Sequence, residues 1–171
     1  MITSVTMIGN GANRAVTGTT WYVDTTQTTW AWSTTYTGQN SFAQGYSWAS
    51  GNTMRWGTNV IDGTSNYNNT SLLSTTFNNV TGSAEGATGD SGGGVFYLNG
   101  STWELAGIMD YIGTFNGQLG STAVFGNLTE FANIAAYDAA ILTAIPEPAD
   151  FATLFGVAAI GFAFWRRRRR A

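Results

Sequence analysis

Up to about residue 125 the chain is a succession of short runs rich in β-branched and aromatic side chains, separated by clusters of Gly, Asn and Ser. Val5 and Met7 alternate with polar neighbours, and Gly9-Asn10-Gly11 breaks this run. Because a period of two places alternate side chains on one face of a strand, the segment predicts a half-buried β-strand. Four further runs predict strands on the same grounds: residues 20–24, 28–36, 53–62 and 71–77.

The clearest local element is a hairpin within residues 94–108. Two apolar runs flank the pair Asn99-Gly100 in this segment. An Asn-Gly pair between such runs is the strongest short-range signal of a tight β-turn. The segment therefore predicts two antiparallel strands joined by a short turn.

One helix is predicted over residues 127–142. Asn127 can cap its N-terminus, and Glu130 follows three residues later. Apolar side chains then recur at helical spacing, at Leu128, Phe131, Ala132, Ala135, Ala139 and Leu142. Pro146 is expected to end the helix. Many short strands followed by a terminal helix favour an all-β fold, either a sandwich or a closed antiparallel barrel.

The C-terminal tail has a different pattern. Residues 151–165 form an uncharged, mostly apolar run, and five Arg residues follow at 166–170. A 15-residue helix spans about 22 Å, short of a hydrocarbon core of about 30 Å, but flanking residues and long Arg side chains could close the gap. The pattern predicts a short transmembrane helix with its Arg end in the cytoplasm. A buried C-terminal helix does not suit the Arg block, and a nucleic-acid patch does not suit the apolar run.

Composition and charge exclude several kinds of chemistry. The 171 residues contain no His, no Cys and no Lys, which removes imidazole bases, thiolates, Schiff bases and nearly every zinc site. We therefore expect no metal and no cofactor. Residues 1–145 carry two cations against eight acids, a net charge of −6, whereas residues 146–171 carry five against two, a net of +3. An acidic body with two cations cannot neutralise a phosphate backbone, so nucleic acid is not an expected partner.

The tail combines Pro146-Glu147-Pro148, a short apolar stretch and a terminal Arg block, in that order. In this it resembles the PEP-CTERM sorting signal. The resemblance covers residues 145–171 and implies an exported Gram-negative protein whose anchor is processed near Pro-Glu-Pro by an exosortase. Such proteins are often linked to surface exopolysaccharide. The implied location is the inner membrane before processing, then the periplasm, outer surface or extracellular matrix.

A candidate site lies at Gly89-Asp90-Ser91-Gly92-Gly93, just before the hairpin. A Ser among glycines lets backbone N–H groups approach a reacting carbonyl without interference from Cβ atoms, which an oxyanion hole requires. The alternative is a flexible Gly/Ser loop in a Gly-rich chain. We take the motif as the candidate site because the residues that follow it, through residue 108, also fit such a site.

Residues 89–96, followed by residues 103–108, resemble the nucleophile region of chymotrypsin-like (trypsin-like) serine proteases. Residues 122–125, leading into the predicted helix, look like that family's last strand and C-terminal helix. The Gly-Asn-Gly of residues 9–11 is similar to a turn early in its second barrel. The resemblance covers most of residues 5–143 and implies the second of two six-stranded Greek-key barrels, with a peptide as substrate.

Carried over residue by residue, the resemblance implies that Ser91 is the nucleophile and that the N–H groups of Gly89 and Ser91 are the oxyanion donors. Glu85 falls at the floor of the primary specificity pocket, where an acid would favour Arg or Lys; the alternative is a solvated loop carboxylate. Asp110 matches a position on the pocket wall usually held by a small residue, and Gly94 stands where Pro is usual. Both departures bear on substrate specificity.

The resemblance leaves one gap, because that family takes the Ser proton with a His oriented by an Asp, both from its first barrel. Without His or Lys, Ser91 is a poor nucleophile, and this chain alone is expected to be inactive. The N-terminus also lacks an export signal. We therefore expect residues 1–144 to be the second barrel of an exported serine endopeptidase whose gene is truncated or degenerate. The alternative is a non-catalytic cell-surface or exopolysaccharide-matrix protein that kept the barrel.

Overall fold

The computed structural model describes residues 3–145 and 148–169. The strands within them are β1 (Thr3–Gly9), β2 (Ala12–Arg14), β3 (Thr19–Asp24), β4 (Ala31–Ser33), β5 (Ser41–Asn52), β6 (Arg55–Tyr67), β7 (Thr70–Thr76), β8 (Gly94–Asn99), β9 (Thr102–Gly113), β10 (Thr122–Val124) and β11 (Leu128–Asn133). A 3-10 turn at Ile134–Tyr137 and the helices α1 (Asp138–Ala144) and α2 (Pro148–Arg168) follow. The chain divides into two compact units, Met1–Ala136 and Tyr137–Ala171.

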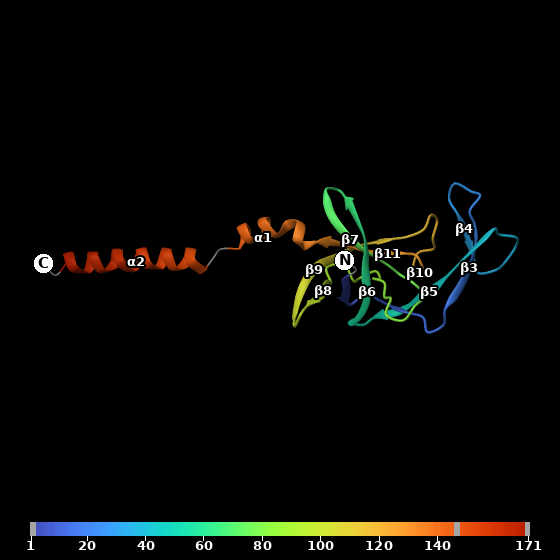
Figure 1. Cartoon of the computed structure of the whole chain (residues 1–171), viewed down its shortest axis with the longest axis horizontal. Helices are drawn as coiled ribbons and strands as arrows, with labels where there is room; N and C mark the ends of the chain where they lie inside the picture. The colour runs from blue at the N-terminus through green and yellow to red at the C-terminus, as the bar shows by residue number, and fades with distance from the viewer. Residues whose placement is uncertain (1–2, 146–147, 170–171) are drawn as a thin grey trace. The chain divides into compact units, whose positions relative to one another are not determined.

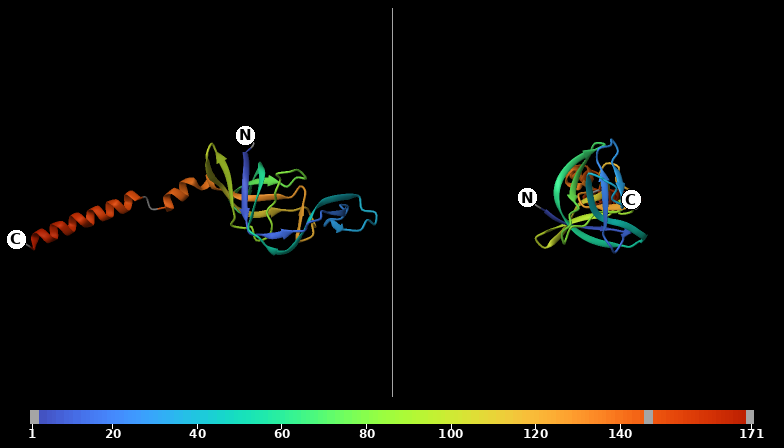
Figure 2. Two further views of the ribbon diagram at one scale, coloured as in Figure 1. Left: turned by 90° about the horizontal axis from the view of Figure 1, so that it is seen from below. Right: turned by 90° about the vertical axis from the view of Figure 1, so that its right-hand side faces the viewer.

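Six strands close into an antiparallel barrel in the order β1-β6-β7-β11-β9-β8 (Figures 1 and 2). Closure comes from the pairing of β8 with β1, through Met7 opposite Val95. Strands β8-β1-β6-β7 thus have Greek-key order, because the long β7–β8 connection returns the chain beside the first strand. The prediction of a closed antiparallel Greek-key barrel is confirmed.

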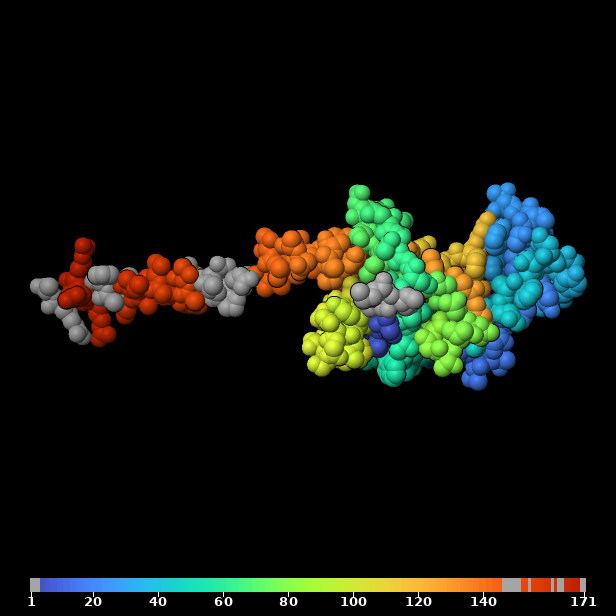
Figure 3. All heavy atoms as spheres, in the orientation of Figure 1, coloured from blue at the N-terminus to red at the C-terminus, as the bar shows by residue number. Residues whose placement is uncertain are grey.

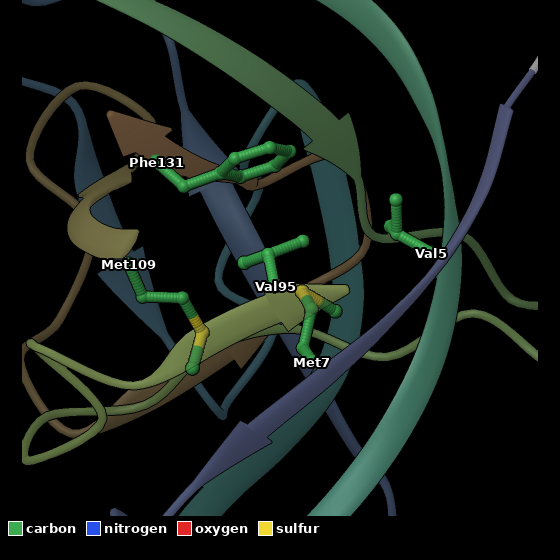
Figure 4. Packing of buried hydrophobic residues seen from close by; sticks show 5 residues of the cluster. All are labelled: Val5, Met7, Val95, Met109 and Phe131. Atoms are coloured by element: carbon green, nitrogen blue, oxygen red, sulfur yellow. The ribbon is translucent and has the colours of Figure 1, made fainter. Parts of the chain in front are cut away.

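The barrel interior is filled by side chains from β1, β8, β9 and β11. Val5, Met7, Val95, Met109 and Phe131 form one cluster, each at most 5% exposed (Figure 4). They come from segments far apart in the chain, so the core forms only when the barrel closes. Phe131 lies at its centre, and a Cβ on Gly107 of the neighbouring strand would overlap the Phe131 ring.

The predicted hairpin is present as β8 and β9. Asn99 pairs with Thr102, so Gly100 and Ser101 are the two turn residues. Gly100 has φ 63°, as the first central residue of a type II′ turn requires, and Asn99 is the last paired residue before it. A second tight hairpin joins β6 to β7 through Asn68 and Asn69, both with positive φ.

A second sheet lies outside the barrel, in the order β10-β5-β3-β4 with β2 also paired to β5. It arises mainly from the segment between β1 and β6 and forms a separate lobe in the space-filling view (Figure 3). Strand β3 matches the strand predicted over residues 20–24, whereas β5 was not predicted, because Gly and polar residues interrupt its apolar side chains. Gly45 of β5 is buried, and a Cβ there would overlap the carbonyl oxygen of Ala123 on β10. Within residues 28–36, Ala31–Ser33 alone is regular strand.

The predicted helix over residues 127–142 is wrong in its first half. Residues Leu128–Asn133 form β11, which pairs with both β7 and β9 and closes the barrel. Their apolar spacing fits a strand as well, since Thr129 and Phe131 are buried at a period of two. Asn127 does not cap a helix; its Oδ1 accepts the backbone N–H of Val124 in a turn. Helical structure begins at Ile134, and α1 ends at Ala144 with Ile145 extended, as expected before a proline.

The tail forms α2, Pro148–Arg168, with Arg166, Arg167 and Arg168 in its last turn. The prediction of a transmembrane helix over residues 151–165 is not met. None of the helices formed by residues 3–145 and 148–169 combines the length and the apolar character needed to cross a membrane. The physical reason is the brevity of the apolar run, which the Arg block and Asp150 bound within 15 residues.

Candidate functional site

The Gly89–Gly93 loop is built from two consecutive turns that share Asp90. The N–H of Asp90 donates to the carbonyl of Ala87 at 2.9 Å, and the N–H of Gly93 donates to the carbonyl of Asp90 at 2.8 Å. The third residue of each turn is a glycine with positive φ, 97° at Gly89 and 83° at Gly92. This is the geometry of type II turns, which favour Gly at that position. The glycines flanking Ser91 are therefore required by the backbone of the loop.

The Asp90 carboxylate holds this loop against the end of β1. The N–H of Gly11 donates to its Oδ1 at 2.5 Å, and the N–H of Ala87 donates to its Oδ2 at 2.8 Å. A Cβ on Gly9 or on Gly11 would overlap the Asp90 side chain. The Gly-Asn-Gly segment, a weak signal in the sequence, is thus the segment against which the Asp90 side chain packs. No sequence pattern pointed to this contact between residues about eighty positions apart.

Strand β9 fixes the other side of the loop. The N–H of Gly92 donates to the carbonyl of Met109 at 2.8 Å, and the N–H of Met109 donates to the carbonyl of Gly93 at 2.8 Å. Because Met109 is buried and side chains alternate along a strand, the next residue, Asp110, is exposed. The loop and the exposed face of β9 border a hollow of about 240 Å³ lined by Gly89, Ser91, Asp110, Tyr111 and Ile112, among others.

Ser91 is exposed at this hollow, and no acceptor or donor within residues 3–145 and 148–169 bonds its hydroxyl. The backbone N–H groups of Gly89 and Ser91 likewise have no acceptor among the described residues, although their neighbours Asp90, Gly92 and Gly93 all donate. Unpaired N–H groups close in sequence to an exposed hydroxyl can stabilise negative charge on an oxygen bound there. The structure thus brings Gly89, Ser91 and Asp110 together at one hollow.

Glu85 is not part of that hollow. It lines a larger cavity on the other side of the loop. The residue is half-buried overall, but both carboxyl oxygens are enclosed and have no hydrogen-bond partner in the part of the chain described. Desolvation raises the pKa of Glu85 to about 9. The Glu85 carboxyl is therefore not the solvated group that one expectation described. Nor does Glu85 line the hollow beside Ser91.

The site lacks a base hydrogen-bonded to Ser91: Asp110 lines the same hollow, but no described side chain bonds the Ser91 hydroxyl. The chain contains no His, Lys or Cys, and Ser91 has no hydrogen-bonded base among its described neighbours. Across the described ranges, no three His, Cys, Asp or Glu side chains gather in a way that could hold a metal ion. Of the tail motif, Pro146 and Glu147 lie outside the described residues, and Pro148 is the first residue of α2.

Comparison with known proteins adds no relative. No family model matches the chain, and no curated protein or solved structure is similar to it. The function of the protein is therefore inferred from the geometry of the site.

Proposed function

We propose that the barrel is the nucleophile-bearing half of a trypsin-like serine endopeptidase, with Ser91 as nucleophile and the N–H groups of Gly89 and Ser91 as the oxyanion hole. The observation that carries the proposal is the pair of unpaired N–H groups beside the exposed Ser91 hydroxyl. A substrate carbonyl oxygen placed between them would gain two donors as it becomes negative. The 240 Å³ hollow would receive the adjoining part of the peptide.

In this proposal the general base comes from outside the 171 residues, because they contain no imidazole or amine side chain and no described carboxylate is hydrogen-bonded to Ser91. A companion barrel that supplies a His would complete the site. Without it, Ser91 remains a neutral alcohol at pH 7 and attacks slowly. The chain by itself is therefore expected to bind at the hollow but to turn over no peptide.

Free imidazole can test the proposal by replacing the missing side chain. The purified chain is treated with a fluorophosphonate, with and without about 0.1 M imidazole as external base. Ser91 Oγ attacks phosphorus, fluoride leaves, and imidazole takes the hydroxyl proton. We expect labelling that depends on imidazole, disappears in Ser91→Ala and persists in Ser101→Ala, whose hydroxyl is exposed in the β8–β9 turn.

Two results would change this view. Strong labelling without imidazole would show that a base already acts on Ser91. Absence of labelling at Ser91 even with imidazole would favour the other candidate, a non-catalytic surface or matrix protein on a protease-like barrel. That candidate draws support from the absence of His and Lys in the chain and of any base hydrogen-bonded to Ser91 among the described residues.

We also propose that residues 145–171 serve as a sorting tail processed by an exosortase in an exporting cell. The order of Pro-Glu-Pro, apolar run and Arg block supports this proposal, as does the basic last turn of α2. Co-expression with an exosortase should shorten the chain near Pro146, and Glu147→Ala should prevent the shortening. An unprocessed wild-type tail in that system would refute the proposal.

A further inference from the structure

The cavity behind the Ser91 loop has a volume of about 610 Å³, within the range of small-molecule sites. It lies wholly within the first compact unit and does not include Gly89, Ser91 or Asp110 in its lining. Aromatic side chains make up much of its wall: Tyr46, Trp48, Trp56, Phe77 and Phe125. Such walls bind flat or apolar bodies well.

Two residues in this wall carry buried polar atoms that have no hydrogen-bond partner within residues 3–145 and 148–169. They are Trp48, through its indole Nε1–H, and Glu85, through both carboxyl oxygens. A buried polar group without a hydrogen bond destabilises a protein, so each such group calls for an explanation. A ligand in the cavity that forms hydrogen bonds with these atoms would explain both unpaired groups.

The chemistry of the two groups narrows the class of ligand. Burial raises the pKa of Glu85 to about 9, so at pH 7 its carboxyl is neutral and offers one O–H donor and one carbonyl acceptor. The indole of Trp48 offers a donor only. A primary carboxamide can bond both residues. Its oxygen has two lone pairs, which can accept the Glu85 O–H and the Trp48 N–H, and its nitrogen can donate to the Glu85 carbonyl. A cation is disfavoured, because Arg14 and Arg55 line the same cavity.

We propose that this cavity binds a neutral ligand with a primary carboxamide on an aromatic or apolar body, its amide paired with Glu85 and Trp48. The carboxyl oxygens of Glu85 and the Nε1 of Trp48 are all covered in the structure, so both side chains turn toward the cavity as the ligand enters. The cavity shares Gly86, Ala87, Asp90 and Met109 with the Ser91 hollow, whereas Glu85 and Trp48 line the cavity alone. The proposal does not depend on the function proposed for Ser91.

Benzamide is a suitable probe, with ligand-observed NMR as the measurement on the full chain; a fragment of this size binds with a Kd of roughly 0.1–1 mM. Glu85→Gln keeps one donor and one acceptor and should hold the Kd within about threefold. Glu85→Met removes both and should weaken binding at least about tenfold. Trp48→Phe removes the N–H alone and should weaken it about fivefold.

Controls separate this site from its surroundings. Trp103→Phe, at an exposed position on β9 outside the cavity, should leave the Kd unchanged. Ser91→Ala should also leave it unchanged, so a failed labelling experiment at Ser91 and a failed benzamide titration are distinguishable. N,N-dimethylbenzamide, which has no N–H, should bind at least about tenfold more weakly than benzamide.

The pH dependence gives a further readout. The other titratable groups that line the cavity are Arg14 on β2, Tyr46 on β5, Arg55 on β6 and Asp90 in the loop, whose carboxylate already accepts two backbone N–H groups. The affinity for benzamide should be constant from about pH 6 to 8 and fall about tenfold per pH unit above about 9, as Glu85 ionises. Glu85→Gln should remove that fall.

The proposal is overturned if benzamide does not bind, or if it binds equally well to Glu85→Met and Trp48→Phe that remain folded by circular dichroism. It is also overturned if benzylamine, a cation of similar size, binds more tightly than benzamide and loses affinity in Glu85→Gln. That second result would assign Glu85 to an ion pair instead.

Discussion

Asp90 and Glu85 are two carboxyl groups five residues apart in the chain that both line the larger cavity, and their surroundings differ. Asp90 accepts two backbone N–H groups and holds the Ser91 loop against β1. The Glu85 carboxyl oxygens are enclosed and find no hydrogen-bond partner among the described residues, and burial raises the pKa of the carboxyl to about 9. One carboxyl organises the loop, whereas the other destabilises the unliganded fold.

The difference shows that a carboxyl group with hydrogen-bond partners and a buried carboxyl group without them indicate different roles. A carboxylate held by backbone N–H groups is part of the scaffold, and Asp90 in this way fixes the loop that carries Ser91. A buried carboxyl without a partner lowers stability, so it points to something absent from the free molecule. Four changes test this contrast, from the largest expected effect on the free energy of unfolding to the smallest.

The pH dependence of stability should report Glu85 most strongly. The unfolded chain ionises Glu85 at about its ordinary pKa of 4.5, whereas the folded chain keeps it protonated to about pH 9. Stability is therefore full below pH 4.5 and falls as pH rises to 9, by up to about 6 kcal/mol. Urea unfolding at several pH values should show this slope in the wild type. Glu85→Gln should flatten it, and parallel curves for the two proteins would contradict the burial of the acid.

Replacing Asp90 should have the next largest effect. Asp90→Ala leaves the N–H groups of Gly11 and Ala87 without an acceptor, and it should lower the free energy of unfolding by about 3–5 kcal/mol. Asp90→Asn, which keeps one acceptor oxygen, should lose about half as much. Equal losses in the two variants would show that the charge, and not the pair of hydrogen bonds, holds the loop.

Two glycine substitutions can separate the contribution of the contact between Gly9 and Asp90 from that of the turn at Gly92. Gly9→Ala would place a Cβ against the Asp90 carboxyl and should cost about 2–3 kcal/mol in chemical unfolding. Gly92→Ala has open space around its Cβ but needs positive φ, and it should cost about 1 kcal/mol. If Gly92→Ala proved the more damaging change, the contact between Gly9 and Asp90 would not be what limits the loop.

Ser91→Ala should have the smallest effect, within about 0.5 kcal/mol of the wild type in thermal or urea unfolding. Its hydroxyl is exposed and makes no hydrogen bond in the described part of the chain, so its removal costs the fold nothing. The same change should abolish imidazole-dependent labelling. A marked loss of stability would mean that the hydroxyl has a structural partner.

Much of the barrel could be predicted from local pattern, but the closing strand could not. The alternation around Val5, the runs of β6 and β7 and the Asn-Gly hairpin all correspond to observed strands. Leu128–Asn133 could not be predicted correctly, because its apolar residues fit both a helical and a strand period. Pairing with β7 and β9 decides between them by burying Phe131 completely. Strand β5 escaped prediction for a similar reason, since its pairing with β3 and β10 outweighs a weak local pattern.

For the site, the sequence by itself determined that Ser91 is the candidate residue, that glycines are needed around it, and that no imidazole base is present. These follow from residue types and short spacings, which act locally along the chain. Only the tertiary structure decided that Asp90 binds Gly11, that Asp110 shares the hollow with Ser91, and that Glu85 and Trp48 line one larger cavity. Those relations join segments that are far apart in sequence, and which carboxyl finds a partner depends on how the closed barrel brings the segments together.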